Sequence, residues 1–89
     1  MASETPKEMT TVRILAFGIA RDILGEGETG IQLPGRPTVA LLRKHLYEKF
    51  PELTKLKSLA IARNNEYAEE NDIITENDEV VLIPPVSGG

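Results

Sequence analysis

The chain finishes with a segment whose composition suits the delivery of one reactive group. Pro84 and Pro85 follow the strand-like run EVVLI, and prolines cannot donate the hydrogen bonds of a β-ladder. We therefore expect the sheet to stop there and a stiff, extended tail to leave it. That tail consists of Val86, Ser87, Gly88 and Gly89. Because glycines without a Cβ let a backbone enter a narrow channel, the tail would present the terminal carboxylate of Gly89 to a partner.

A carboxylate in this position needs activation before it can react. Adenylation by a partner enzyme would create a leaving group on the acyl carbon of Gly89, which a sulfur, thiol or amine nucleophile could then attack. The chain has no cysteine and therefore no thiol nucleophile, disulfide or thiolate metal site. Its single histidine, His45, lies between Lys44 and Leu46, which supply no catalytic or metal-binding partner. We expect no metal site, and we expect His45 to be a surface residue of a helix.

Length, composition and charge narrow the class of protein. An 89-residue chain with 40% hydrophobic and 27% charged residues is expected to form one ordinary globular domain. It has no apolar run near the roughly 18 residues of a membrane helix, and residues 1–10 lack the apolar core of a secretory signal. We therefore expect a flexible N-terminal extension over residues 1–10 and a cytoplasmic protein that does not enter a membrane.

The charges are unevenly distributed along the chain. No Lys or Arg follows Arg63, whereas acidic residues recur from Glu66 to Glu79. An acidic surface repels phosphate backbones, so we expect no nucleic-acid partner. The acidic residues would either attract a protein with a basic docking surface or simply give solubility.

Hydrophobic periodicity predicts the elements that must hold the tail. In TVRILAFG (11–18), Val12, Ile14 and Ala16 alternate with the intervening residues, as in a β-strand. A short helix ending at Gly25 is expected next, followed by a brief strand within residues 27–35 that pairs back on the first.

The strongest helical period lies in residues 37–53. Thr38 has the side chain of an N-cap, and Pro51 is expected to stop the helix. Arg43 lies off the apolar stripe of this helix, so a solvated position is expected for it. The segment predicts the main core helix of the domain.

Two short strands and a closing strand complete the order. Asn64 and Asn65 suit a tight turn between the short strands, and residues 79–83 read as the last strand. The result is an α+β domain over residues 11–85, with one main helix on a mixed sheet of four to five strands. The order is similar to the ubiquitin-like β-grasp topology, in which the first and last strands are central neighbours.

The first and last strands are apolar on both faces, which one helix cannot cover. If the two strands are neighbours, their outer side chains form an exposed apolar patch, a common feature of protein interfaces. We expect this partner interface to consist of Leu15, Phe17, Tyr67, Val81 and Ile83. The alternative is that loops cover these side chains.

Two stretches of the chain resemble a known family. RILAFGIARDILG (13–25) and DEVVLIPPVSGG (78–89), with the β-grasp order between them, resemble the small, sulfur-carrier subunit of molybdopterin synthase. The resemblance covers residues 11–89. A terminal diglycine is common to ubiquitin-like carriers and modifiers, whereas PPVSGG at the end of a chain is specific to this family.

The resemblance implies a function and partners. The Gly89 carboxylate would be adenylated with ATP by a partner similar to ubiquitin-activating enzymes, and then converted to a thiocarboxylate. The loaded tail would enter the large synthase subunit and give its sulfur to the cyclic pyranopterin precursor of molybdopterin. Two small subunits would flank a dimer of large subunits in a heterotetramer. The small subunit would be a non-catalytic carrier that binds no cofactor itself, and Phe17, Tyr67 and Ile83 match the apolar interface of the family.

Other functions remain open for a chain of this kind. It could carry sulfur for thiamine synthesis or tRNA thiolation, although thiamine-pathway carriers are usually shorter and lack the double proline. It could be a ubiquitin-like modifier whose Gly89 forms an isopeptide bond with lysine. It could also be an interaction domain with an inert tail, and adding a residue after Gly89 would then leave its function intact.

Overall fold

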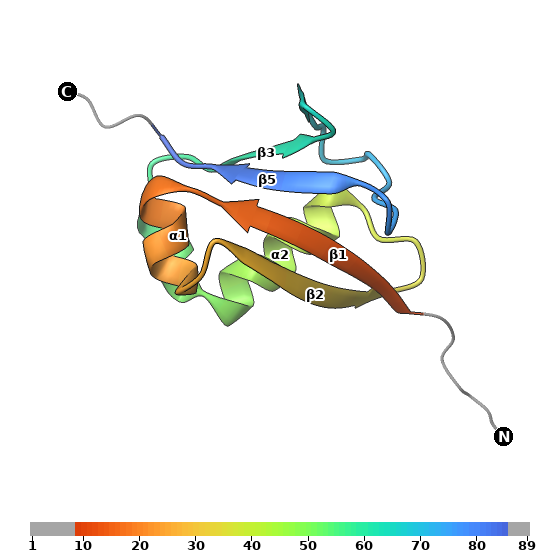
Figure 1. Cartoon of the computed structure of the whole chain (residues 1–89), viewed down its shortest axis with the longest axis horizontal. Helices are drawn as coiled ribbons and strands as arrows, with labels where there is room; N and C mark the ends of the chain where they lie inside the picture. Colours follow the sequence, from red (N-terminus) through yellow and green to blue (C-terminus); the bar gives the residue numbers. More distant parts are fainter. Residues whose placement is uncertain (1–8, 86–89) are drawn as a thin grey trace, which may run out of the picture.

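The computed structural model describes residues 9–85, which form a five-stranded sheet with helices packed on one face (Figure 1). The elements in chain order are β1 (Met9–Ala16), α1 (Gly18–Leu24), β2 (Glu28–Pro34), α2 (Val39–Lys49), the 3₁₀ helix η1 (Pro51–Lys55), β3 (Ala60–Arg63), β4 (Glu66–Tyr67) and β5 (Glu79–Ile83). Within the described residues, no helix has the length and apolar character needed to cross a membrane.

The order of strands across the sheet is β2-β1-β5-β3-β4. β1 and β5 are parallel central neighbours, and the other pairs are antiparallel. This arrangement confirms the predicted mixed sheet and the pairing of the second strand with the first. β1 begins at Met9, two residues before the expected domain boundary at residue 11.

The core lies between the sheet and α2, which crosses behind the strands in Figure 1. Alternate residues of β1, among them Val12 and Ile14, are fully buried, as are Leu42 and Leu46 of α2. The inward faces of β2, β3 and β5 add Leu33, Ile61, Val80 and Leu82 to this cluster. Each such side chain contributes about 1.5 to 3 kcal/mol by leaving water, so packing on one face of the sheet holds the fold together.

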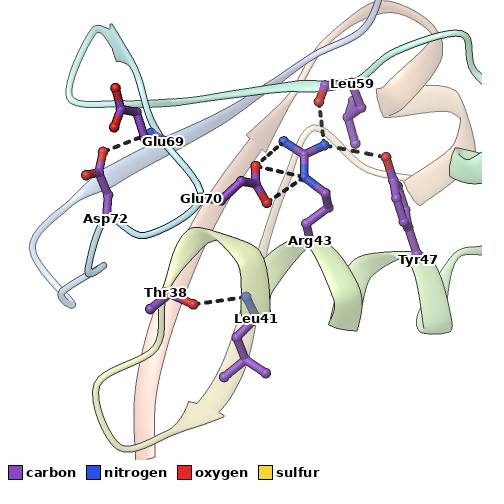
Figure 2. Close-up of polar contacts among 8 residues, drawn as sticks. All are labelled: Thr38, Leu41, Arg43, Tyr47, Leu59, Glu69, Glu70 and Asp72. Atoms are coloured by element: carbon purple, nitrogen blue, oxygen red, sulfur yellow. Dashed lines mark hydrogen bonds and ion pairs between the residues drawn. The ribbon is translucent and has the colours of Figure 1, made fainter.

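Local signals set the starts and ends of the helices where the sequence predicts them. The Thr38 hydroxyl accepts a hydrogen bond from the backbone N–H of Leu41 at 3.1 Å, which caps α2 (Figure 2). α2 ends at Lys49, and Pro51 begins η1 after the single residue Phe50. Gly25 has a φ of 87° and caps the C-terminus of α1, a conformation that costs glycine little because it has no Cβ.

Arg43 departs from its expected solvated position. Its guanidinium binds both carboxylate oxygens of Glu70, with Nη2 3.0 Å from Oε2, and donates from Nη1 to the Leu59 carbonyl at 2.6 Å (Figure 2). The side chain is only 24% exposed. Arg43 therefore ties α2 to the chain before β3 and to the acidic segment after β4. The Glu70 carboxylate of that acidic segment therefore has a structural role.

Candidate docking face and tail exit

The face of the sheet opposite α2 carries an apolar region formed by neighbouring strands. Leu15 of β1 pairs with Val81 of β5, Val81 pairs with Ala62 of β3, and Ala62 pairs with Tyr67 of β4. Directly paired residues project on the same side of a sheet. These four side chains therefore form one row across the sheet. Ile83, two residues beyond Val81 on β5, projects on the same face in the neighbouring row.

Phe17 extends this apolar region past the end of β1. Its backbone is still extended, with φ −129° and ψ 161°, so the alternation of β1 continues and Phe17 projects on the side of Leu15. Phe17 is 58% exposed and Tyr67 is 74% exposed. Loops thus leave both aromatic rings uncovered. The five residues expected at a partner interface share one face, which we call the docking face; its binding role stays a prediction.

The docking face ends where charged residues begin. Arg13 pairs in register with Glu79 of β5, and its Nε lies 3.5 Å from a carboxylate oxygen of Glu28. Both side chains of this ion pair are more than half exposed, so the pair adds little to stability. It separates the apolar region from the end of the sheet at which β1 begins.

A hollow of about 280 Å³ lies within the docking face. The residues that line it are Ala62, Asn65, Tyr67, Val81 and Ile83. Ala62 and Asn65 are absent from the interface expected from the sequence. The two-residue turn at Asn64 and Asn65 offered a usable signal, because such a turn pairs residue 62 with residue 67.

The chain leaves the sheet beside the start of α1. Pro84 and Pro85 follow the end of β5 at Ile83 and are half-buried. A Cβ added to Gly18 would lie 3.8 Å from Cγ of Pro84, and Gly18 has a φ of 59°, a conformation that side-chain-bearing residues rarely adopt. Gly18 thus lets α1 start next to the first proline of the exit. Figure 1 shows α1 and the end of β5 at the same end of the sheet.

Four of the expected tail residues lie outside the described residues. They are Val86, Ser87, Gly88 and Gly89. Within residues 9–85, no group of three or more His, Cys, Asp or Glu side chains is arranged to hold a metal ion. His45 is half-buried on α2.

A buried carboxylate fixes the turn beside the hollow. Asp78 is 7% exposed and accepts hydrogen bonds from the Thr75 backbone N–H at 2.8 Å and from the Asn64 amide at 2.8 Å. Arg63 adds a longer contact at 3.5 Å. Asn64 also accepts from the backbone N–H of Glu79 at 2.9 Å. The turn between β3 and β4 is therefore anchored to the start of β5.

The surroundings of Asp78 lower its pKa. Burial by itself raises the pKa, but hydrogen bonds from Thr75 and Asn64 and the positive charge of Arg63 outweigh burial and hold the pKa below its ordinary value of 3.8. As pH falls, the unfolded chain therefore takes up the Asp78 proton before the folded protein does. The stabilisation is complete above the ordinary pKa and is lost as the pH falls through the folded pKa.

We predict that Asp78→Asn lowers the free energy of unfolding by about 1 to 2 kcal/mol at neutral pH, because a charge-assisted hydrogen bond is lost in a buried site. Urea unfolding of both proteins at a series of pH values measures the difference. The gap between wild type and variant should narrow below the ordinary pKa of Asp78. If the difference in the free energy of unfolding stays constant down to the pH of acid unfolding, the folded protein does not stabilise the ionised form of Asp78.

The sheet order and the position of the tail exit define a ubiquitin-like β-grasp protein. Solved structures share this fold. The archaeal modifier SAMP1 from Haloferax volcanii has a TM-score of 0.75 at 24% identity, covering 89% of this chain and 99% of that one. Subunits 1 and 2 of the molybdopterin-converting factor of Helicobacter pylori form a complex in which a chain matches with a TM-score of 0.60 at 29% identity, over 89% of this chain and 99% of that one.

Sequence comparisons place the chain more narrowly. The ThiS family model matches residues 14–89. A molybdopterin synthase sulfur carrier subunit of Arabidopsis thaliana is 33% identical over 79 residues, or 88% of this chain and 82% of the relative. One of Caenorhabditis briggsae is 34% identical over 84 residues, or 91% of this chain and all of the relative. The chain belongs to the ThiS family, together with the molybdopterin synthase sulfur carrier subunits.

Proposed function

We propose that this chain is the sulfur carrier subunit of molybdopterin synthase and that Gly89 carries the sulfur. The observation that supports this proposal most strongly is the similarity to relatives of that name along nearly the whole chain. The family match extends through the diglycine to residue 89. The exposed docking face and the double proline at the exit of the sheet are consistent with a domain that binds a partner and inserts a tail into it.

The proposed chemistry needs a partner for every step. A carboxylate oxygen of Gly89 attacks the α-phosphorus of ATP in the active site of an adenylyltransferase related to ubiquitin-activating enzymes, and pyrophosphate leaves. A sulfur nucleophile at the oxidation level of sulfide then attacks the acyl carbon, and AMP leaves, so that the terminus becomes a thiocarboxylate. The large synthase subunit receives the loaded tail, and the sulfur passes to the cyclic pyranopterin precursor. Water restores the carboxylate oxygen.

This proposal assigns a narrow role to the small subunit. It holds no cofactor of its own, ATP is used by the activating partner, and the chain is a non-catalytic component of a heterotetramer with the large subunit. We further propose that the protein acts in the cytoplasm and that neither nucleic acid nor a membrane is among its partners.

The absence of cysteine makes the thiocarboxylate directly detectable. We predict that iodoacetamide alkylates the protein isolated from its native host once per molecule, because the chain has no cysteine and a thiocarboxylate sulfur would be its one strong sulfur nucleophile. Intact mass spectrometry with fragmentation should locate the label at Gly89. Protein from a host without the activating enzyme is the control and should stay unlabelled.

The outcome also separates this function from its rivals. A ladder of lysine conjugates with no alkylated form would identify a protein modifier. A thiocarboxylate that reconstituted synthase cannot convert into molybdopterin would identify a carrier for thiamine or tRNA thiolation. A Gly89 carboxylate that stays unlabelled in cells making molybdopterin would contradict the proposal.

A further inference from the structure

The row of side chains across the docking face contains one small member. Tyr67, Ala62, Val81 and Leu15 are directly paired in succession from β4 to β1. Ile61, the residue before Ala62, is buried in the core beneath the sheet, so Ala62 projects to the docking face. Its methyl group stands between the larger side chains of Tyr67 and Val81. The surface is hollowed at this point.

The size and lining of the hollow limit what can fill it. Its volume of about 280 Å³ is below the usual range for small-molecule pockets, about 300 to 1,000 Å³. It is several times the roughly 30 Å³ that one water occupies in the liquid. None of the five lining side chains is charged, and Asn65 is the one amide among them. These properties suit a single apolar side chain.

The wall of the hollow is held in place before any partner binds. Asn64 and Asn65 have positive φ values of 54° and 73°, as a tight two-residue hairpin turn requires. The bonds of Asn64 to Asp78 and Glu79 anchor that turn to β5. Because β4, which contains Tyr67, follows the turn directly and pairs with β3, the backbone position of Tyr67 is fixed as well, and a preformed hollow saves ordering free energy on binding.

We propose that the hollow over Ala62 is a socket for one apolar side chain of the large synthase subunit. This inference rests on the proposed function, because the socket is continuous with the docking face assigned to that subunit. Anchors that fill pockets near the centre of an interface dominate affinity. The hollow extends from Tyr67 on the edge strand β4 to Val81 and Ile83 on the central strand β5, so it reaches the middle of the docking face. Ala62 is small so that the anchor can enter.

The test fills the socket without changing the polarity of the face. Ala62→Leu should raise the dissociation constant for the large subunit from the same organism at least about tenfold, because the added side chain occupies the space of the anchor. Ala62 is 7% exposed but lies outside the core cluster on the other face of the sheet, so the melting temperature should change little. Isothermal titration calorimetry and thermal unfolding measure the two effects.

A matched substitution on the same strand provides the control. Ala60 is in register with Ile83 of β5 and is not among the residues that line the hollow. Ala60→Leu adds the same bulk to the same face, beside Ile83 and not over Ala62, and should raise the dissociation constant clearly less than Ala62→Leu does. An Ala62→Leu variant that binds as well as wild type, or no worse than Ala60→Leu, overturns the socket.

A measurement on the unmodified chain makes the test independent of folding of the variants. With ¹³C-methyl alanine, the Ala62 methyl should show intermolecular NOEs to methyl or aromatic protons of the large subunit in the complex. A complex that forms and yields molybdopterin without such NOEs overturns the socket and leaves the sulfur-carrier function standing. A wild-type chain that does not bind the large subunit at all overturns both.

Discussion

A chain that ends at Gly88 is expected to yield no molybdopterin, although it folds and still binds the large subunit through the docking face. Deletion of Gly89 moves the terminal carboxylate back by one residue, or about 3.5 Å. Reactions that depend on placing an attacking atom within contact distance are lost at smaller errors than that. The core cluster of the described residues, 9–85, packs between the sheet and the helices, so the melting temperature should change little. Product formation with ATP, activating enzyme, sulfur source, large subunit and precursor measures the effect.

Two companion variants separate placement from other causes. Deletion of Ser3 removes one residue from the opposite end of the chain and should leave product formation unchanged. Gly88→Val retains the carboxylate of Gly89 but adds a branched side chain to a tail expected to enter a narrow channel, so it should also lose most product. Normal product from the chain without Gly89 would end the sulfur-carrier interpretation.

Phe17→Ala is expected to weaken binding of the large subunit by on the order of 2 kcal/mol, about thirtyfold in the dissociation constant. The physical reason is that Phe17, 58% exposed in the free domain, would lose most contact with water in the complex. Alanine keeps the extended backbone before α1, and little buried surface is lost in the free protein. Calorimetric titration with the large subunit, together with thermal unfolding, gives both quantities.

Ile19 offers a matched control for this prediction. It is 49% exposed and lies on α1 beside Ile23 and Leu56, away from the docking face. Ile19→Ala removes a similarly exposed apolar side chain and should leave the dissociation constant nearly unchanged. The assignment of the docking face fails if both substitutions weaken binding equally, or if Phe17→Ala unfolds the domain.

Features that depend on near neighbours in the chain could be predicted from the sequence. The cap at Thr38, the left-handed residue at Gly25 and the tight turn at Asn64 and Asn65 are all present. Each depends on the chemistry of one or two side chains and the backbone within about four residues. The alternation of β1 and β5 likewise identified the residues that project to each face. Alternation is fixed by backbone geometry alone.

Features that depend on which strands meet could not be predicted in the same way. Arg43 was expected in solvent, yet it binds Glu70 and the Leu59 carbonyl because the fold brings both segments against α2. Asp78 is one of the acidic residues that recur from Glu66 to Glu79 in the sequence, but in the fold it is 7% exposed and is bound by Asn64 and Arg63. Part of the acidic segment thus stabilises loops, which sequence composition cannot distinguish from a solvated surface.

By itself, the sequence determined the order of elements, the apolar character of the outer strand faces and the resemblance carried by residues 13–25 and 78–89. Only the tertiary structure decided that Leu15, Val81, Ala62 and Tyr67 form one row. Local pattern fixes the face on which a side chain projects, but its neighbours across the sheet depend on strand order and register. Strand order and register are set by packing of the whole core. They place Ala62 among the residues that line the hollow.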